Sequence, residues 1–303
     1  MATISENLQT IIDIKDDIKT AIENKGVTVG DASFGEYAGK IDSISQSVSS
    51  WTLPTGVRFQ GTTVTEMPKI YYDNLYSGAQ LFLNCTNLIT FNGIEGSDNC
   101  VRIDGMFSNC SSLENVALFN TSNVSNGRSV FANCSSLQTI PLFNFNNLLV
   151  AESMFYQCSS LQTIPSLFFG KCVDMSRAFY YCNKLTTLPL LDFGDVYSVY
   201  NTFEFCSSLE NVGGFKDLGK GIINPVNDSR YPTTNMTLGH LNLQYSSKLT
   251  YQSCLNIFNN LYDVTNLGPT IKVMLHPTPY ALLSEDDIAI ATNKGWTVER
   301  APL

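Results

Sequence analysis

The sequence predicts an α/β solenoid of stacked coils, preceded by an α-helical segment at the N-terminus. Three observations lead to this fold class: a 24-residue repeat, prolines that recur after the expected strand in three of the six regular coils, and an amphipathic pattern in the first 25 residues. The chain has 303 residues, of which 44% are hydrophobic, so one or two domains with a sizeable core are expected. We expect residues 1–50 to form one unit and residues 51–303 to form the other.

The repeat is carried by six of the nine cysteines, which follow one another at intervals of 25, 24, 24, 24 and 24 residues. Each is preceded three residues earlier by Phe and followed three residues later by Leu, so the unit reads F-x-x-C-x-x-L. The six are Cys85, Cys110, Cys134, Cys158, Cys182 and Cys206. One such coil cannot bury its apolar edge alone, and neighbouring coils therefore stack.

Within one coil, the Leu and a second apolar residue three positions later bracket a short strand, which pairs with the strand of the next coil. Pro141, Pro165 and Pro189 follow this strand, and proline cannot donate to a strand ladder. The strands are therefore expected to span about four residues, fewer than the usual five or six. A short helical turn, such as residues 152–157 or 200–205, then leads to the next Cys.

The period divides residues 51–303 into three parts. Residues 55–81 contain Val64, Met67 and Pro68 in a degenerate match to the repeat and are expected to cap the first coil. Residues 82–212 are the regular repeats, and residues 213–303 are irregular C-terminal repeats with a closing cap. In this last part we expect strands at His240–Leu243, Ile271–Leu275 and Trp296–Val298, a helix capped by Thr250 that runs through Leu261, and a helix from Ser284 to Lys294, where Ser284 and Asp287 form a capping box.

The N-terminal segment predicts two helices. Residues 4–25 have a 4-3 apolar pattern that ends at Gly26, and a second helix is expected at residues 33–44 before a Ser-rich linker. Such a hairpin has too little core to be stable alone. It needs the solenoid, copies of itself or another protein as its partner. The apolar stripe proposed for oligomerisation or attachment is Ile4, Leu8, Ile11, Ile18 and Ile22.

Composition argues against several classes of function. The formal net charge is -9 and no Lys/Arg run occurs, so binding to nucleic acid or to an anionic membrane is not expected. No apolar stretch reaches about 18 residues, so no membrane insertion is expected. The N-terminus lacks the pattern of a secretion signal. With two histidines and no catalytic motif, we expect no enzyme activity, no metal and no cofactor.

The cysteine column has two interpretations. Disulfide or metal sites are one, but side chains stacked in one column point the same way, which suits disulfide geometry poorly. Small buried core residues with a weak S–H donor are the other, and this is the interpretation we favour. Cys100, Cys172 and Cys254 lie outside the repeat register.

Two sets of side chains are candidates for recognition. One row is expected beside the strand of each coil and serves either as a ligand-binding face or as a solvated sheet face. Its members are Glu114, Gln138, Gln162, Thr186 and Glu210. The aromatic residues Tyr156, Tyr180, Tyr181 and Phe205 flank the cysteines. They could stack on sugar rings, bury at an interface, or fill gaps between coils.

Two resemblances to known families follow from these motifs. The M-F-x-x-C-x-x-L signature at residues 106–113 and 154–161 resembles the leucine-rich repeats of BspA-like bacterial surface proteins, over roughly residues 55–220. It implies a leucine-rich-repeat solenoid with an adhesive or recognition role. Residues 11–15 and 25–31 resemble N-terminal attachment segments in virion proteins of gut bacteriophages, including crAss-like phages, and imply a fibre anchored through its N-terminus.

Together these observations predict a non-enzymatic phage virion protein, a tail or head fibre, assembled in the host cytoplasm. Its expected partners are further copies in a homotrimer, other virion proteins at the N-terminus, and a glycan or protein of the host surface. Two alternatives remain open: a bacterial surface adhesin of the BspA type, and a polysaccharide depolymerase.

Overall fold

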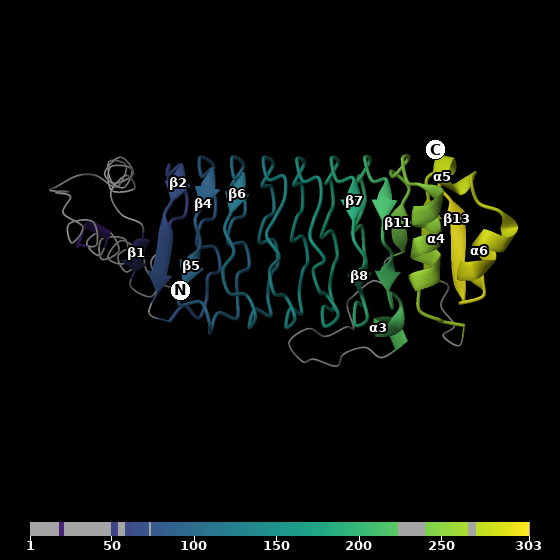
Figure 1. The fold of residues 1–303 in the computed structure, drawn as a ribbon, viewed down its shortest axis with the longest axis horizontal. Helices are drawn as coiled ribbons and strands as arrows, with labels where there is room; N and C mark the ends of the chain where they lie inside the picture. The colour runs from purple at the N-terminus through teal and green to yellow at the C-terminus, as the bar shows by residue number, and fades with distance from the viewer. Residues whose placement is uncertain are drawn as a thin grey trace, which may run out of the picture.

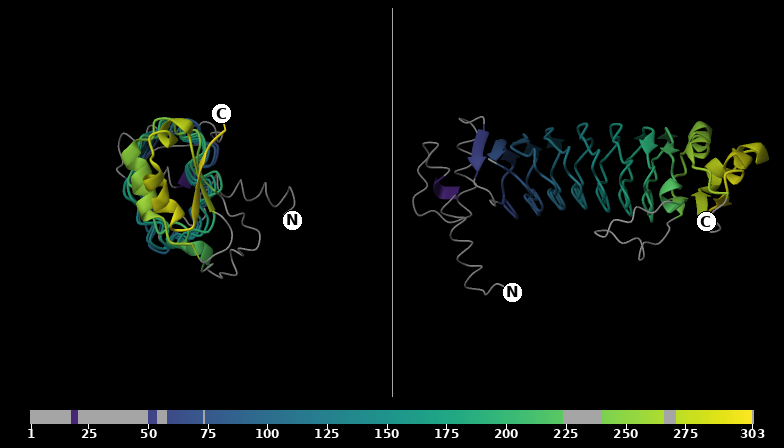
Figure 2. Two further views of the ribbon diagram at one scale, coloured as in Figure 1. Left: turned by 90° about the vertical axis from the view of Figure 1, so that its right-hand side faces the viewer. Right: turned by 90° about the horizontal axis from the view of Figure 1, so that it is seen from below.

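A computed structural model describes residues 18–20, 50–53, 58–72, 74–223, 240–265 and 271–302. Within these residues the fold is mixed α/β, with short parallel strands, few helices and no closed barrel. Successive turns of the chain, which we call coils, stand side by side along the long axis of the molecule, from β1 at one end to α6 at the other (Figure 1). Viewed along that axis, the coils superimpose (Figure 2).

The strands are short everywhere except at the two ends of the stack. They are β1 (Ser50–Leu53), β2 (Glu66–Met67), β3 (Lys69–Tyr72), β4 (Thr90–Phe91), β5 (Ile94–Glu95), β6 (Asn115–Val116), β7 (Thr187–Leu188), β8 (Leu191–Asp192), β9 (Asn211–Val212), β10 (Phe215–Lys216), β11 (Leu241–Leu243), β12 (Ile271–Leu275) and β13 (Trp296–Arg300). The helices are α3 (Lys220–Ile223), α4 (Tyr251–Asn260), α5 (Pro277–Tyr280) and α6 (Glu285–Thr292).

All strand pairs are parallel, and they join residues about one repeat apart. The sheets have the orders β1-β3-β5, β2-β4-β6, β7-β9, β10-β8 and β11-β12-β13. Thr187 pairs with Asn211, 24 positions on. Isolated parallel bridges continue the same spacing through the middle of the stack, from Ser77 through Arg102, Asn126, Val150 and Asp174 to Ser198. The sequence period is therefore the length of one coil.

The expected strands lie where the repeat places them, but they are shorter than predicted. β4, β6, β7 and β9 each have two residues at the end of the segment between the Leu and the next apolar residue. Residues 137–149 contain no strand at all. Pro141 follows the apolar position there and has no N–H group to donate. The strand ladder of that coil is therefore reduced to isolated hydrogen bonds.

The segments expected to be short helical turns are not helical. Each contains two residues with positive φ, four positions apart, for example Ser153 and Gln157. The left-handed conformation costs about 1–2 kcal/mol per non-glycine residue, so other contacts must offset it. The first members are Gln80, Gly105, Ser129, Ser153, Arg177 and Asn201; the second members are Asn84, Asn109, Asn133, Gln157, Tyr181 and Phe205. We call this segment the double turn.

The backbone hydrogen bonds of the double turn alternate in direction, which explains its conformation. The amides of Met106 and Ser108 donate within the turn, to the carbonyl oxygens three residues earlier. The amides between and beside them, such as those of Gly105 and Phe107, donate to carbonyls of the next coil. Together with the left-handed residues four positions apart, this pattern directs every second N–H of the turn toward the neighbouring coil. The double turn thus forms hydrogen bonds both within a coil and between coils.

The core of the stack is a column of phenylalanine rings. The repeat Phe residues are buried, and consecutive rings lie 5.2–5.6 Å apart between centroids with interplanar angles of 2–18°. The column contains Phe82, Phe107, Phe131, Phe155, Phe179 and Phe203. Near-parallel rings at this distance gain stacking energy beyond the apolar area that they bury.

The N-terminal end contains one coil residue that the sequence pattern missed. Phe59 stacks on Phe82 with centroids 5.3 Å apart, and so extends the column by one ring. Val64 and Met67 of the expected cap are fully buried. Residues 18–20 are helical, as predicted, and Ile18 is buried in the same hydrophobic cluster as the coils. Ile4, Leu8, Ile11 and Ile22, the expected helix at 33–44 and the Ser-rich linker lie outside the described residues.

The C-terminal elements agree with the capping signals in the sequence. The Thr250 side chain accepts a hydrogen bond from the Ser253 amide at the start of α4. Ser284 and Asp287 form the predicted capping box of α6. β12 forms as predicted and β13 extends two residues beyond its predicted end, to Arg300; β12 pairs in parallel with β11 on one side and with β13 on the other. α6 ends at Thr292, two residues earlier than expected.

A further degenerate coil was missed at residues 243–249. Leu243, Ser246 and Leu249 are buried and occupy the Phe, Cys and Leu positions of the repeat. The Ser246 hydroxyl donates to the carbonyl oxygen of Cys206, 40 residues earlier, at 3.2 Å. The coil between them is 16 residues longer than the 24-residue coils. The 24-residue period therefore does not reveal these repeat positions in the sequence.

The Phe column makes a specific prediction for stability. Replacing Phe131 with Ala should lower the free energy of unfolding by about 3–5 kcal/mol, because it removes a buried ring between two stacked neighbours. Phe131→Leu should cost less. Urea unfolding followed by circular dichroism measures both. Phe168→Ala is the matched control, since that ring is 41% exposed; an equal loss in the control would contradict the account.

Candidate recognition surface

The predicted polar row is brought together by the backbone ladder. The amides of Gln162, Thr186 and Glu210 each donate to the carbonyl oxygen of the row member one coil earlier, at 2.9–3.0 Å. Glu114 occupies the same ladder position, since its amide donates to Ile89. Glu114, Gln138 and Gln162 are exposed, while Thr186 and Glu210 are half-buried. The row therefore crosses consecutive coils on one face.

The side chains of this row are suited to hydrogen bonding. The Gln162 amide nitrogen lies 3.5 Å from the Gln138 amide oxygen, and the Thr186 hydroxyl donates to the Gln162 carbonyl oxygen at 3.2 Å. Carboxylates stand only at the two ends, Glu114 and Glu210. The row extends one step further than the sequence indicated, because the Thr250 amide donates to the Glu210 carbonyl.

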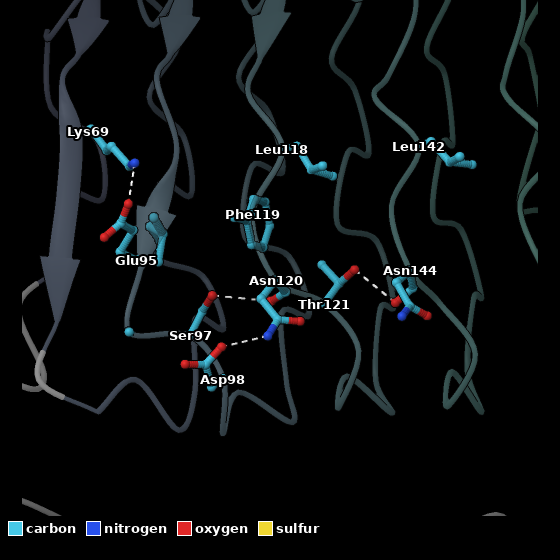
Figure 3. A pocket seen from close by; sticks show the side chains of 12 residues that line it. Lys69, Glu95, Ser97, Asp98, Leu118, Phe119, Asn120, Thr121, Leu142 and Asn144 are labelled. Carbon is cyan, nitrogen blue, oxygen red and sulfur yellow. Dashed lines mark hydrogen bonds and ion pairs between the residues drawn. The ribbon is translucent and has the colours of Figure 1, made fainter.

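One hollow, of about 570 Å³, lies on the face formed by β3 and β5 and the coils that follow them (Figure 3). Lys69 and Glu95 form an ion pair at one side. The Asn120 amide donates to the Asp98 carboxylate at 2.6 Å. The exposed side chains of Leu118 and Leu142 project beside each other.

The polar groups of this first hollow are largely engaged with each other. The buried hydroxyls of Ser97 and Thr121 donate to carbonyl oxygens of the next coil, those of Asn120 and Asn144. Their hydrogen bonds hold neighbouring coils together. We therefore assign these groups to the structure of the stack.

A second hollow, of about 370 Å³, lies next to the cysteine column. It is lined on one side by a row of serines at the position after each Cys and on the other by the second left-handed residues of the double turns. The lining residues are Ser111, Asn133, Ser135, Gln157, Ser159 and Tyr181. None of them carries a formal charge at neutral pH. Of these six residues, only Tyr181 is a recognition candidate on sequence grounds.

The candidate aromatic residues form two stacks between coils. Tyr156 and Tyr180 are parallel with centroids 5.2 Å apart. Tyr181 stacks on Phe205 at 4.3 Å, and Phe205 stacks on Tyr245 at 4.1 Å. Most ring faces are thus covered by another ring, as the gap-filling interpretation expects. Tyr245 was missed because it belongs to the degenerate coil.

The cysteines of the repeat have a structural role. All nine thiols are free and buried. The Cys110, Cys134 and Cys158 thiols donate to the carbonyl oxygen of the Phe in the coil before, with Sγ–O distances of 3.0–3.1 Å. Cys182 and Cys206 repeat this contact. Each thiol is therefore a small core residue that satisfies one buried acceptor, which matches the interpretation favoured from the sequence.

Burial keeps four of these thiols protonated, whereas a side-chain hydrogen bond with Cys110 lowers the pKa of Cys85 to about 7. Removal from water disfavours the thiolate and raises the pKa of Cys158 and Cys206 to about 12. The pKa values of Cys134 and Cys182 are raised by burial as well. Low-pKa thiols are the reactive ones, so these positions are suited to packing rather than to nucleophilic chemistry.

Two of the described carboxylates are engaged in ion pairs with a basic residue one coil away. Asp192 forms an ion pair with Lys216 at 2.8 Å. Glu152 forms one with Arg128 at 2.9 Å, and burial raises its pKa. In the described part of the chain, no group of three or more His, Cys, Asp or Glu residues is placed to hold a metal ion.

Comparison with known proteins gives one family. Residues 77–193 match the model of a family described as "Mycoplasma protein of unknown function, DUF285". This similarity is compatible with a BspA-like repeat protein and covers the regular coils as far as residue 193. No curated protein matches the chain. Among the described residues, no helix has both the length and the apolar character needed to cross a membrane.

The buried thiols predict how stability depends on pH. In the unfolded chain a cysteine titrates near pH 8.5, whereas Cys158 and Cys206 stay protonated up to about pH 12 when folded. The native state then binds more protons than the unfolded state, so stability falls as pH rises between these values. Each such thiol contributes a slope of about 1.4 kcal/mol per pH unit.

Urea unfolding at pH 8 and pH 10.5 under reducing conditions measures this slope. In the double variant Cys158→Ser, Cys206→Ser, the free energy of unfolding should fall less steeply with pH, because a hydroxyl does not titrate in this range. Serine occupies the equivalent position at Ser246, where it is buried and its hydroxyl donates to a different carbonyl oxygen of the coil before, that of Cys206. An unchanged slope in the variant would show that these thiols are not the source.

Proposed function

We propose that this chain is a non-enzymatic phage virion fibre protein, in which a leucine-rich-repeat solenoid of the BspA-like type displays a recognition surface to the host. The observation that carries the proposal is the polar row of Glu114, Gln138, Gln162, Thr186 and Glu210. A backbone ladder holds these side chains at the spacing of the coils, about 4.8 Å, so a flat and regular binding surface exists before any ligand arrives.

The surface chemistry supports recognition rather than catalysis. A row of amide and hydroxyl groups offers both donors and acceptors to a glycan or a protein surface. Preformed geometry lowers the entropic cost of binding. The described carboxylates of this face are separated along the stack, and Glu114 and Glu210 are four coils apart in the repeat register. Glycoside hydrolysis requires two carboxyl groups within roughly 10 Å of each other.

The N-terminal segment supports attachment to a particle. A segment of about 50 residues has too little core to be stable alone, and residues 11–31 resemble virion attachment segments. Within this proposal residues 1–50 bind other virion proteins and bring copies of the chain together as a homotrimer. Ile18 belongs to the same buried cluster as the coils, and the proposal assigns the contacts with a partner to the other residues of the stripe.

A bacterial surface adhesin of the BspA type is the second candidate. The match of residues 77–193 to a family described from Mycoplasma favours it, because those are cellular organisms and not phages. Both candidates use the same recognition surface. They differ in what the N-terminal segment does.

Removing that segment separates the candidates. Residues 1–49 can be deleted without removing β1, whose residues Ser50–Leu53 pair with β3. Light scattering in reducing buffer should give a trimer for the full chain and a monomer for the truncated chain. Circular dichroism of the truncated chain provides the control for folding. Monomers in both cases would contradict the fibre proposal, since no copy would then be recruited through the N-terminus.

A further inference from the structure

We propose that the hollow beside the cysteine column binds an uncharged polysaccharide. This inference goes beyond the proposed function, on which it rests for the setting in which the glycan is met, because the hollow shares no residue with the polar row and adds a site and a ligand class of its own. The hollow is formed by Ser111, Ser135 and Ser159 on one side and by Asn133, Gln157 and Tyr181 on the other. Its volume of about 370 Å³ is within the range of small-ligand sites.

The two sides of the hollow are fixed by the same structural device. The serines directly follow Cys110, Cys134 and Cys158, and Asn133 and Gln157 directly precede two of these cysteines. Because each cysteine is anchored by its thiol and by the double turn, the flanking side chains project from rigid positions. A ligand would therefore meet a site with little conformational entropy left to lose.

The polar groups of the hollow leave acceptors for hydroxyl donors. The Ser135 hydroxyl donates to the Ser111 carbonyl at 3.1 Å, so its own lone pairs remain available. The Asn133 side chain donates to Asn109 at 2.7 Å, and its amide oxygen is left as an acceptor. Gln157 is exposed, and its amide nitrogen donates to the Tyr156 hydroxyl at 3.4 Å, which leaves its second N–H and its amide oxygen for a ligand. The hydroxyl groups of a sugar can donate to these acceptors and accept a hydrogen bond from the Gln157 amide.

Tyr181 supplies the apolar contact. Phe205 covers one face of its ring at 4.3 Å, while the ring lines the hollow and is 40% exposed. The C–H face of a pyranose ring is apolar and stacks on an aromatic face of this kind. Phe205 and Tyr245 support the ring from behind, so the stacking platform is held in place.

The absence of charge selects the ligand class. None of the six lining residues is Lys, Arg, Asp or Glu, so an acidic sugar would enter without a counter-charge. The net charge of -9 further repels polyanions. The lining residues come from consecutive coils about 4.8 Å apart, a step close to the length of one sugar ring in an extended chain. A polymer running along the stack can therefore place one ring on each coil.

The direct test is binding of the purified full chain to neutral polysaccharides. Native gels that contain mannan, xylan, β-glucan or dextran should show retardation by at least one of them, and none with polygalacturonate. Failure of all four neutral polymers would overturn the inference. Equal retardation by polygalacturonate would overturn the assignment to uncharged ligands.

Tyr181→Asn is the most informative variant. Tyr181 has a positive φ, and Asn occupies the same left-handed position at Asn84, Asn109 and Asn133, so the fold is expected to tolerate it. Losing the ring should weaken binding about tenfold, the factor that corresponds to one aromatic contact. Tyr181→Phe should bind like the wild type, because the ring face is retained.

Tyr76→Ala is the matched control, since Tyr76 is 63% exposed and lies outside the hollow. Unchanged affinity in Tyr181→Asn, with circular dichroism equal to the wild type, would refute the site. The chain lacking residues 1–49 should bind with unchanged intrinsic affinity when it is a monomer. A binding failure and a failure of N-terminal assembly are therefore measured separately.

Discussion

The hydrogen bond between one coil and the next is the interaction on which the rest of the structure depends. In the double turn, the Phe107 amide donates forward to the carbonyl of Val130, while the Cys134 thiol donates back to the Phe107 carbonyl at 3.1 Å. Both groups are buried, and an unpaired buried amide or carbonyl would cost about 1–3 kcal/mol. Cysteine suits the position because it is small, apolar and still a donor. The left-handed residues on either side are strained on their own, and the ladder that they make possible offsets their cost.

This constraint also explains the surface. Because every coil is anchored at its cysteine, a side chain at a fixed offset from the cysteine lies in line with its equivalents in other coils. One offset gives the Phe column, another gives the serines of the second hollow, and another gives the row from Glu114 to Glu210. Surface rows can change in chemistry without disturbing the core. The double-turn position, for example, is Asn in three coils, then Gln157, then Tyr181, while its backbone keeps positive φ.

Sequence reasoning recovered the period, the core residues of each repeat and the helix caps, because these depend on local patterns such as the Ser284–Asp287 box. It did not recover features that depend on geometry between coils. Phe59 was missed because the first coil is one residue shorter between Phe and Phe, and Ser246 because the preceding coil is longer. The double turn was predicted as helical because residues such as Arg177 and Tyr181 carry no glycine-like signal for positive φ. The second hollow was missed because its two sides are separated by the buried cysteines and approach only when the coils stack.

The most direct test of the central claim is deletion of one whole coil. Removing residues 135–158 joins Cys134 to Ser159 and keeps every repeat position in register. The account predicts a soluble protein that unfolds cooperatively, with a urea m value reduced in proportion to the lost surface, and with the circular dichroism spectrum per residue unchanged. Removing residues 135–146, half a coil, should abolish folding, because the two ladders can then no longer align. An unfolded product from the 24-residue deletion, or equal stability of the two deletions, would contradict the claim that each coil is an independent stacking unit.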